Sequence, residues 1–371
     1  MLTEEVVFVM KKSRFFLCAV GSIALCAALF HACDLGGGGV LGTLYMSDTY
    51  NGRVYTYDPN TQTSSATPLL TTGEGAGDHI YFFNGICYIA VGNNYSNTPG
   101  VYAFDPEAVV PVAESIGTSI SAQFIMFYND TKAYVTEADY GASTGVYWFD
   151  PSDPDAGLSG PIDSGKINIG EGMYLQDIVA SNNKIYVADN GNGRVLVIDP
   201  ATDTLLKTIS TSAGGTTGLL LARGESGEPF VYVANNGGYD SSWNPLPGSI
   251  DRIDTRDDTL LQVVPGLSAG HLAYHAQSRK MFAIGYANTY VFSTAGSPPF
   301  AVSEVKTRTG ASFGGSDILV NDFLLYIASH DFLTRVSTLY VFDTATSSEA
   351  DHSPLTVGVS GEDGITGLAV R

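Results

Sequence analysis

Four titratable side chains stand at matching positions of a repeating pattern: His79, Asp177, His271 and Asp317. Each opens a short apolar segment, and Gln123 holds the same position in another copy of the repeat. Imidazole and carboxylate groups are the usual protein ligands of zinc, manganese and iron, and they also act as general acids and bases. The pattern therefore admits a metal centre or an acid–base site.

The same positions also have a purely structural interpretation, because polar side chains at the starts of strands commonly satisfy backbone groups and ordered water. Residues from distant repeats would also lie too far apart to share a metal at bond lengths of about 2.0 to 2.1 Å. We therefore expect a solvated polar pocket without a stoichiometric transition metal, any other cofactor or a catalytic residue. Its expected lining residues are His79, Gln123, Asp177, His271 and Asp317.

A second group consists of aromatic residues in long segments between predicted strands: Tyr95, Tyr140, Tyr239, Trp243 and Phe332. Exposed aromatic side chains in long loops suit the recognition of a partner. The alternative is that these rings fold back over the strands as caps, since Tyr is often only half buried.

The stretch from 184 to 209 shows which elements position these residues. Its three predicted strands are Lys184–Ala188, Arg194–Ile198 and Thr204–Ile209. Asp189–Gly193 supplies residues that tolerate the positive φ of a hairpin turn, so the first two strands are antiparallel. Asp199 and Pro200 end the second strand, because the Asp side chain can accept a bond from a backbone N–H two residues on and Pro removes a ladder donor.

This stretch resembles the YVTN and NHL families of β-propeller repeat. Their blade has an inner strand, a Tyr-Val-Ala-Asn/Asp strand, a Val-x-Val-Ile-Asp strand and an outer strand. The matching residues are Tyr186–Asp189 and Val195–Asp199. The resemblance implies an all-β fold whose ligands usually bind on the face formed by the links into the inner strands and the loops between second and third strands. It does not identify a ligand.

Weaker copies of the stretch recur at spacings of 43 to 52 residues, which are lengths typical of propeller blades. The aromatic residue of the second strand recurs at Tyr45, Tyr88, Tyr134, Tyr186, Tyr232, Phe282 and Tyr326. The polar residue that ends the third strand recurs at Asp58, Asp105, Asp150, Asp199, Asp254, Ser293 and Asp343. Both patterns predict seven four-stranded antiparallel blades, with little helix.

The two ends of the repeat region are complementary. Residues 42–45 begin on a second-strand pattern with no inner strand before it, and residues 364–371 form an inner-strand pattern with nothing after it. Pairing the C-terminal strand with the N-terminal blade would satisfy both exposed edges. We therefore expect this pairing to close the ring.

The first residues resemble the leader of an exported lipoprotein. Met10 precedes a basic cluster and fits better as the start, and the uncharged segment Phe15–Phe30 has the length of a signal peptide core. Leu29–Cys33 resembles a relaxed bacterial lipobox, followed by a Gly-rich stretch typical of a tether. The expected division is a signal peptide at 1–32, a lipidated Cys33 with a tether at 33–42, and a propeller at 43–371.

The chain carries a formal charge of −20 at pH 7. Such an acidic protein repels nucleic-acid phosphates and anionic lipid headgroups, so we expect no nucleic-acid partner and membrane contact only through the lipid anchor. Cys87 lies in an apolar segment and is expected to be a small buried hydrophobe, so the domain should have no disulfide.

These observations predict an exported monomer, anchored to the periplasmic or surface face of the cell envelope. It would bind or scaffold an envelope protein, a peptide or a glycan through its loop-rich face. The alternative is an enzyme at the mouth of the channel, similar to lactonase-like hydrolases or quinoprotein-like oxidoreductases. No complete catalytic constellation in the sequence supports the enzyme.

Overall fold

The computed structural model describes residues 41–72, 77–92, 98–118, 120–139, 144–158 and 174–371. The expected signal peptide, Cys33 and the tether up to residue 40 lie outside this part of the chain. No helix among the described residues is long and apolar enough to span a membrane.

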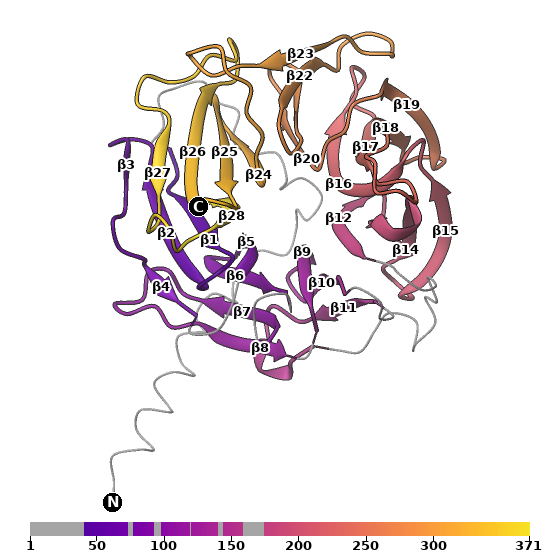
Figure 1. The fold of residues 1–371 in the computed structure, drawn as a ribbon. Coiled ribbons are helices and arrows are strands. Elements are labelled where there is room, and N and C mark those ends of the chain that lie inside the picture. Colours follow the sequence, from indigo (N-terminus) through magenta and orange to yellow (C-terminus); the bar gives the residue numbers. More distant parts are fainter. Residues whose placement is uncertain (1–40, 73–76, 93–97, 119, 140–143, 159–173) are drawn as a thin grey trace, which may run out of the picture. The chain divides into compact units, whose positions relative to one another are not determined.

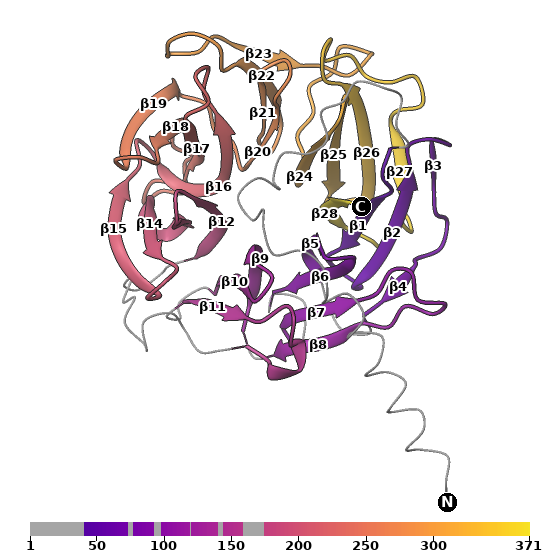
Figure 2. The same cartoon turned by 180° about the vertical axis from the view of Figure 1, so that it is seen from behind.

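Seven antiparallel sheets follow one another in a ring, in chain order, as the blades of a β-propeller. Figure 1 shows the sequence colours passing from indigo through magenta and orange to yellow around this ring, and Figure 2 shows the same order from behind. The predicted all-β, seven-bladed fold is confirmed. In blade three, three strands fall within the described residues.

In every blade the strands run in order from the channel outward. Blade one consists of β28 (Ile365–Val370), β1 (Leu44–Asp48), β2 (Arg53–Asp58) and an outer strand in two pieces, β3 (Thr63–Ser64) and β4 (Leu70–Thr71). Blade two consists of β5 (Gly77–Phe83), β6 (Ile86–Val91), β7 (Gly100–Phe104) and β8 (Glu114–Thr118). Blade three consists of β9 (Ala122–Asn129), β10 (Lys132–Glu137) and β11 (Val146–Phe149). Blades four and five are β12 (Leu175–Ser181), β13 (Lys184–Asp189), β14 (Arg194–Asp199), β15 (Thr204–Ser210); and β16 (Gly214–Arg223), β17 (Pro229–Gly237), β18 (Ser249–Asp254), β19 (Thr259–Pro265).

Blades six and seven are β20 (His271–His275), β21 (Lys280–Ile284), β22 (Thr289–Ser293), β23 (Val302–Val305); and β24 (Asp317–Asn321), β25 (Leu324–Asp331), β26 (Val336–Asp343), β27 (Leu355–Val357). Two 3-10 turns, η1 (Pro154–Ala156) and η2 (Asn190–Asn192), are the helical segments found in the described residues.

The second-strand aromatics form the core between the blades. All seven are buried: Tyr45, Tyr88, Tyr134, Tyr186, Tyr232, Phe282 and Tyr326. A ring at this position packs between two neighbouring sheets, so the recurrence seen in the sequence is the spacing of the core itself. Cys87, on β6 beside Tyr88, is a buried free thiol as expected.

The Asp residues that end the third strands make the predicted turns. The Asp199 carboxylate accepts a hydrogen bond from the Ala201 backbone N–H at 2.9 Å. Four other blades repeat this bond two residues on, at Asp58, Asp105, Asp150 and Asp254, over 2.8 to 3.0 Å. The side chain thus ends the strand and fixes the reversal into the outer strand.

The C-terminal strand closes the ring, as predicted. β28 pairs with β1 in antiparallel register, with Tyr45 opposite Ala369 and Met46 opposite Leu368. In both views the C-terminus lies among the strands of blade one. The last described strand therefore supplies the inner strand of the first blade, and neither strand is left with a free edge at that point.

A polar network reinforces this closure. The Asp48 carboxylate accepts N–H bonds from Gly364 at 2.7 Å and from Asn51 at 2.9 Å. The Asp363 carboxylate accepts a bond from the Tyr55 hydroxyl at 2.6 Å and pairs with the Arg53 guanidinium at 2.7 Å. Burial raises the pKa of Asp48 to about 6, and the nearby Asp363 charge adds to the rise. Two carboxylates thus hold the final link onto blade one.

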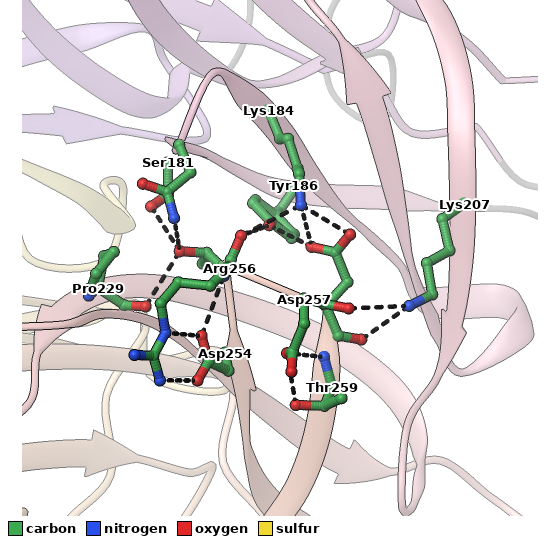
Figure 3. Close-up of polar contacts among 12 residues, drawn as sticks. Ser181, Lys184, Tyr186, Lys207, Pro229, Asp254, Arg256, Asp257 and Thr259 are labelled. Atoms are coloured by element: carbon green, nitrogen blue, oxygen red, sulfur yellow. Dashed lines mark hydrogen bonds and ion pairs between the residues drawn. The ribbon is translucent and has the colours of Figure 1, made fainter.

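Neighbouring blades are also joined by a recurring contact on the outer turns. The Lys184 ammonium and the Tyr186 hydroxyl of blade four both donate to the Asp258 carboxylate of blade five, at 2.8 and 2.7 Å. Figure 3 shows Lys184 and Tyr186 pointing toward this turn, with Lys207 reaching it from the other side. The Lys207 ammonium donates to the Asp258 carbonyl at 3.1 Å.

The contact recurs between blades three and four, where Lys132 and Tyr134 donate to the Asp203 carboxylate at 2.7 and 2.8 Å. Asp203 and Asp258 both have a positive φ, of 53° and 59°, which turns the carboxylate back toward the preceding blade. In blade seven the equivalent Tyr326 hydroxyl is buried with no hydrogen-bond partner among the described residues. The inter-blade contact is therefore not uniform around the ring.

Candidate channel and loop-face sites

The residues predicted to ring the channel all lie at or near the start of an inner strand. His79 is on β5, Gln123 on β9, Asp177 on β12, His271 on β20 and Asp317 on β24. Gly218 and Gly367 hold the same position on β16 and β28. A Cβ on Gly218 would fall 2.5 Å from the Gly270 carbonyl oxygen, so only glycine permits this approach of β16 to the start of β20.

The structure brings His79 and His271 together across the channel. Their ring centroids are 5.7 Å apart, and the Phe124 ring stacks on His79 at 4.1 Å. Side chains of distant blades therefore do approach one another in this channel, whereas the expectation that the channel residues share no metal stays a prediction. Burial lowers the pKa of His79 well below its ordinary value and lowers that of His271 to about 4. Both rings are therefore neutral at pH 7.

Asp177 and Asp317 each tie their blade to the next one. In both, one carboxylate oxygen accepts the N–H of the following residue at 2.8 Å. The other oxygen accepts an N–H from the next blade, Leu219 at 2.9 Å for Asp177 and Leu368 at 2.8 Å for Asp317. This matches the structural interpretation, in which these side chains satisfy backbone groups.

Burial raises the pKa of both carboxyl groups to about 7, against the opposing effect of the backbone N–H donors. The charge of Asp177 further raises the pKa of Asp317, so the two carboxyl groups interact electrostatically. Each carboxyl group is therefore partly protonated near neutral pH. Gln123, the fifth predicted residue, is buried. Among the described residues, no three His, Cys, Asp or Glu side chains gather as metal ligands would.

The loop face carries exposed aromatic side chains. The exposed fraction is 64% for Tyr239, 81% for Trp243 and 53% for Phe332. The capping alternative is therefore wrong for Tyr239 and Trp243, whose rings lie 6.0 Å apart. Phe332 contacts His330 edge-on at 4.8 Å. Tyr95 and Tyr140 lie outside the described residues.

Two further exposed side chains belong to this face, and sequence reasoning missed them. Tyr286, in the short β21–β22 loop, is 88% exposed, and Leu333, beside Phe332, is 96% exposed. The signal that could have found Tyr286 was positional, because it occupies the same second-to-third strand loop as Trp243 and Phe332. Its loop, residues 285–288, is four residues long, as is the 332–335 loop that carries Phe332, so the position in the repeat is a better guide than loop length.

The loop that presents Trp243 is organised by one carboxylate. Asp240 Oδ1 accepts the backbone N–H of Ser242 at 2.8 Å and of Asn244 at 2.9 Å. Asp240 Oδ2 accepts the Asn244 side-chain amide at 3.0 Å, and these bonds to Asn244 lower the pKa of Asp240. Trp243 is held at a φ of 63°, where bulky residues are rarely found. These bonds therefore fix the backbone that presents the exposed Trp243 side chain.

A cleft of about 580 Å³ opens beside Tyr239 on the same face. Its walls are the β13–β14 turn of blade four, the link into β16 and the β17–β18 loop of blade five. Its lining residues are Asn190, Gly191, Asn192, Gly193, Thr211, Ser212, Ala213, Gly214, Gly215, Gly237, Gly238, Tyr239 and Leu246.

Comparisons with known proteins define the fold. No protein family model matches the chain, and no curated protein matches it. A functionally unknown protein from Desulfotomaculum acetoxidans is similar in structure, with a TM-score of 0.60 and 13% identity over 89% of this chain and 98% of that one.

The dihydro-heme d1 dehydrogenase NirN has a TM-score of 0.53 and 12% identity over 90% and 76% of the two chains. A chain of the nidogen/laminin complex has a TM-score of 0.50 and 10% identity over 88% and 97%. At these identities the likeness shows the propeller fold alone, and the varied neighbours point to no single activity.

Proposed function

We propose that the protein is an envelope-anchored, YVTN/NHL-type propeller that binds or scaffolds another molecule through its loop face. The observation that carries this proposal is the set of exposed aromatic side chains on the second-to-third strand loops of blades five, six and seven. Tyr and Trp are enriched at protein interfaces, where a large aromatic ring leaves water on binding. The Asp240-bound loop holds Tyr239 and Trp243 in place before binding, which lowers the entropy cost of association.

Three further parts of this proposal rest on the sequence. Cys33 is the acylated residue, the protein is exported to the periplasmic or surface side of the envelope, and it is a monomer. The acidic surface favours neutral or cationic partners over nucleic acid. The partner is an envelope protein, a peptide or a glycan.

The test is photo-crosslinking from the loop face in cells. A photoreactive residue at position 243 of the full chain should capture a specific molecule, and the same residue at position 109 should not. Val109 is a matched control because it is fully exposed in the β7–β8 turn, which lies on the opposite face of the ring. Binding of the purified partner should weaken at least tenfold, about 1.4 kcal/mol, on combined Tyr239→Ala and Trp243→Ala substitution. Equal capture from both positions, or unchanged affinity, contradicts the proposal.

A second candidate is an enzyme at the channel, and the geometry of His79, His271, Asp177 and Asp317 is what favours it. Two neutral imidazoles and two carboxyl groups with a pKa near 7 face one channel, and perturbed titratable groups are a mark of acid–base sites. Elemental analysis and an absorbance scan of the purified protein decide between the candidates. One tightly held zinc or manganese per chain, lost on His79→Ala or His271→Ala, would favour the enzyme over the binding module.

A further inference from the structure

The cleft beside Tyr239 differs from the rest of this acidic protein in its lining. The chain has 38 Asp and Glu residues, yet none of the lining residues carries an ionised side chain at pH 7. Two carboxylates bond to lining residues, but both are fully buried behind them: Asp189 accepts the Asn192 side-chain amide at 3.1 Å and pairs with Arg194, and Asp251 accepts the Ser212 N–H at 2.7 Å. The cleft therefore offers no charge to a cationic ligand, and the field of the whole protein repels an anionic one.

The floor of the cleft is made of backbone. A Cβ added to Gly214 would lie 3.2 Å from the Gly237 carbonyl oxygen, and one added to Gly193 would lie 3.1 Å from the Gly214 Cα. Three chain segments thus run against one another where any larger residue would have to move them. A ligand in the cleft would meet peptide groups and short polar side chains instead of apolar pockets.

The polar side chains supply both donors and acceptors. Asn190 is partly exposed, and its side-chain amide makes no hydrogen bond within the described residues. Ser212 adds an exposed side chain from the link into β16. Neutral amide and hydroxyl groups can each donate and accept, which matches the hydroxyl groups of a ligand that also does both.

One wall is aromatic. Tyr239 lines the cleft, and Trp243 lies next to it with a ring separation of 6.0 Å and an interplanar angle of 49°. A flat ring beside a row of neutral hydrogen-bonding groups accommodates a ring-shaped ligand with one apolar face and a polar rim. A peptide would need an open strand edge or pockets for its side chains, and Leu246 is the only large aliphatic residue of the lining.

From these features we propose that the cleft between blades four and five binds a neutral oligosaccharide, with Tyr239 stacking on a sugar ring and Asn190 bonding its hydroxyl groups. This inference rests on the proposed binding function and specifies its ligand and its position on the loop face. Phe323 is exposed in the β24–β25 turn, on the face opposite the loops, and serves as the matched aromatic control.

The experiment screens the purified full chain against arrays of neutral and anionic oligosaccharides and of peptides, and then measures affinity by calorimetry for the strongest hit. We expect a neutral oligosaccharide to bind. Tyr239→Ala should weaken it at least tenfold and Asn190→Ala about threefold, whereas Phe323→Ala should change the affinity less than twofold. Unfolding temperatures of the three variants equal to that of the wild type show that the losses come from the site.

The other outcomes separate this inference from the function on which it rests. A peptide that binds and is lost on Tyr239→Ala overturns the oligosaccharide and preserves the binding module. An oligosaccharide whose affinity is unchanged by Tyr239→Ala and Asn190→Ala overturns the cleft. If no array component binds and the crosslinking from position 243 also fails, both the inference and the proposed function are wrong.

Discussion

The imidazoles of His79 and His271 lie 5.7 Å apart, ring centre to ring centre, although they come from blades two and six. The same channel is lined by Asp177 and Asp317, whose carboxylates each accept a backbone N–H of the next blade. Charging any of these four groups places a charge in a confined space, so the channel links the protonation of these groups to the stability of the ring.

The first prediction follows from the opposite signs of these pKa shifts. The pKa of Asp177 and that of Asp317 are raised from 3.8 to about 7. The stabilisation linked to these raised values is fully present below pH 3.8 and is lost as the pH rises toward 7. The lowered His271 pKa of about 4 gives stability that is complete above 6.5 and is lost as pH falls toward 4. The quantity to compare is the unfolding temperature at pH 8 minus that at pH 5. Asp177→Asn should make this difference more positive than in the wild type.

His271→Asn should make the difference in unfolding temperature between pH 8 and pH 5 more negative than in the wild type. The expected change is about 3 °C for each of the two variants. The measurement is thermal unfolding at both pH values for the two variants and the wild type. Shifts of the same sign in the two variants would contradict the assigned protonation states.

The second prediction concerns closure. Deleting residues 365–371 removes the buried side chains Ile365 and Leu368 and leaves both β1 and the channel edge of blade one unpaired. We expect the unfolding temperature to fall by about 10 °C or more, because several kcal/mol of core burial are lost. Arg371→Ala is the control, since it removes the ion pair to Glu107 and the side-chain bond to Tyr45 but keeps β28. A truncated protein that melts with the control would show that β28 does not close the ring.

The third prediction compares two tyrosines at the same position of the repeat. The Tyr186 hydroxyl donates to Asp258 at 2.7 Å, whereas the buried Tyr326 hydroxyl has no partner among the described residues. Tyr186→Phe should lower the free energy of unfolding by about 1 kcal/mol, because it removes a hydrogen bond to a carboxylate. Tyr326→Phe should raise it by up to about 1 kcal/mol, because it removes an unsatisfied buried hydroxyl.

Chemical denaturation of the two variants measures both effects. Each substitution removes only the hydroxyl group and keeps the aromatic ring that packs in the core. Equal losses in the two variants would show that Tyr326 has a partner after all, such as a bound water.

The fourth prediction concerns the anchor. If Cys33 is acylated, Cys33→Ser protein should move from the membrane fraction to the soluble fraction, because a lipid chain would be its only attachment to the bilayer. Cys18→Ser is a matched control within the leader. Fractionation followed by immunoblotting measures the distribution, and equal membrane retention of Cys33→Ser and wild type would exclude lipidation as the attachment.

The fold was predictable because its signals are local and repeated. The buried aromatic of each second strand and the polar residue that ends each third strand, Asp in six blades and Ser293 in blade six, recur at blade spacing. Each copy therefore supports the same alignment of the repeat. The closure was predictable for a related reason: the start and end of the repeat lacked complementary strands.

The site was predictable only in part. The sequence placed His79 and His271 on the channel but not their separation, which depends on the channel width and on side-chain direction. Asp203 and Asp258 bond to Lys and Tyr side chains that lie 69 to 74 positions earlier in the chain, and no local sequence pattern predicts such contacts. The sequence around Asn190 predicts a hairpin turn, and the structure has this turn between β13 and β14. The ligand contact that we propose for Asn190 depends on the Gly-rich start of β16, which packs against the turn.

Closure by β28 also determines when, during synthesis of the chain, the propeller can complete its folding. Every other described strand precedes β28 in the chain, so during synthesis blade one is made first and completed last. Until residues 365–370 emerge, β1 has an open edge and the ring cannot shut. The propeller can therefore reach its final cooperative state only after synthesis has passed residue 370, and a chain that stalls earlier remains an unfinished and aggregation-prone arc.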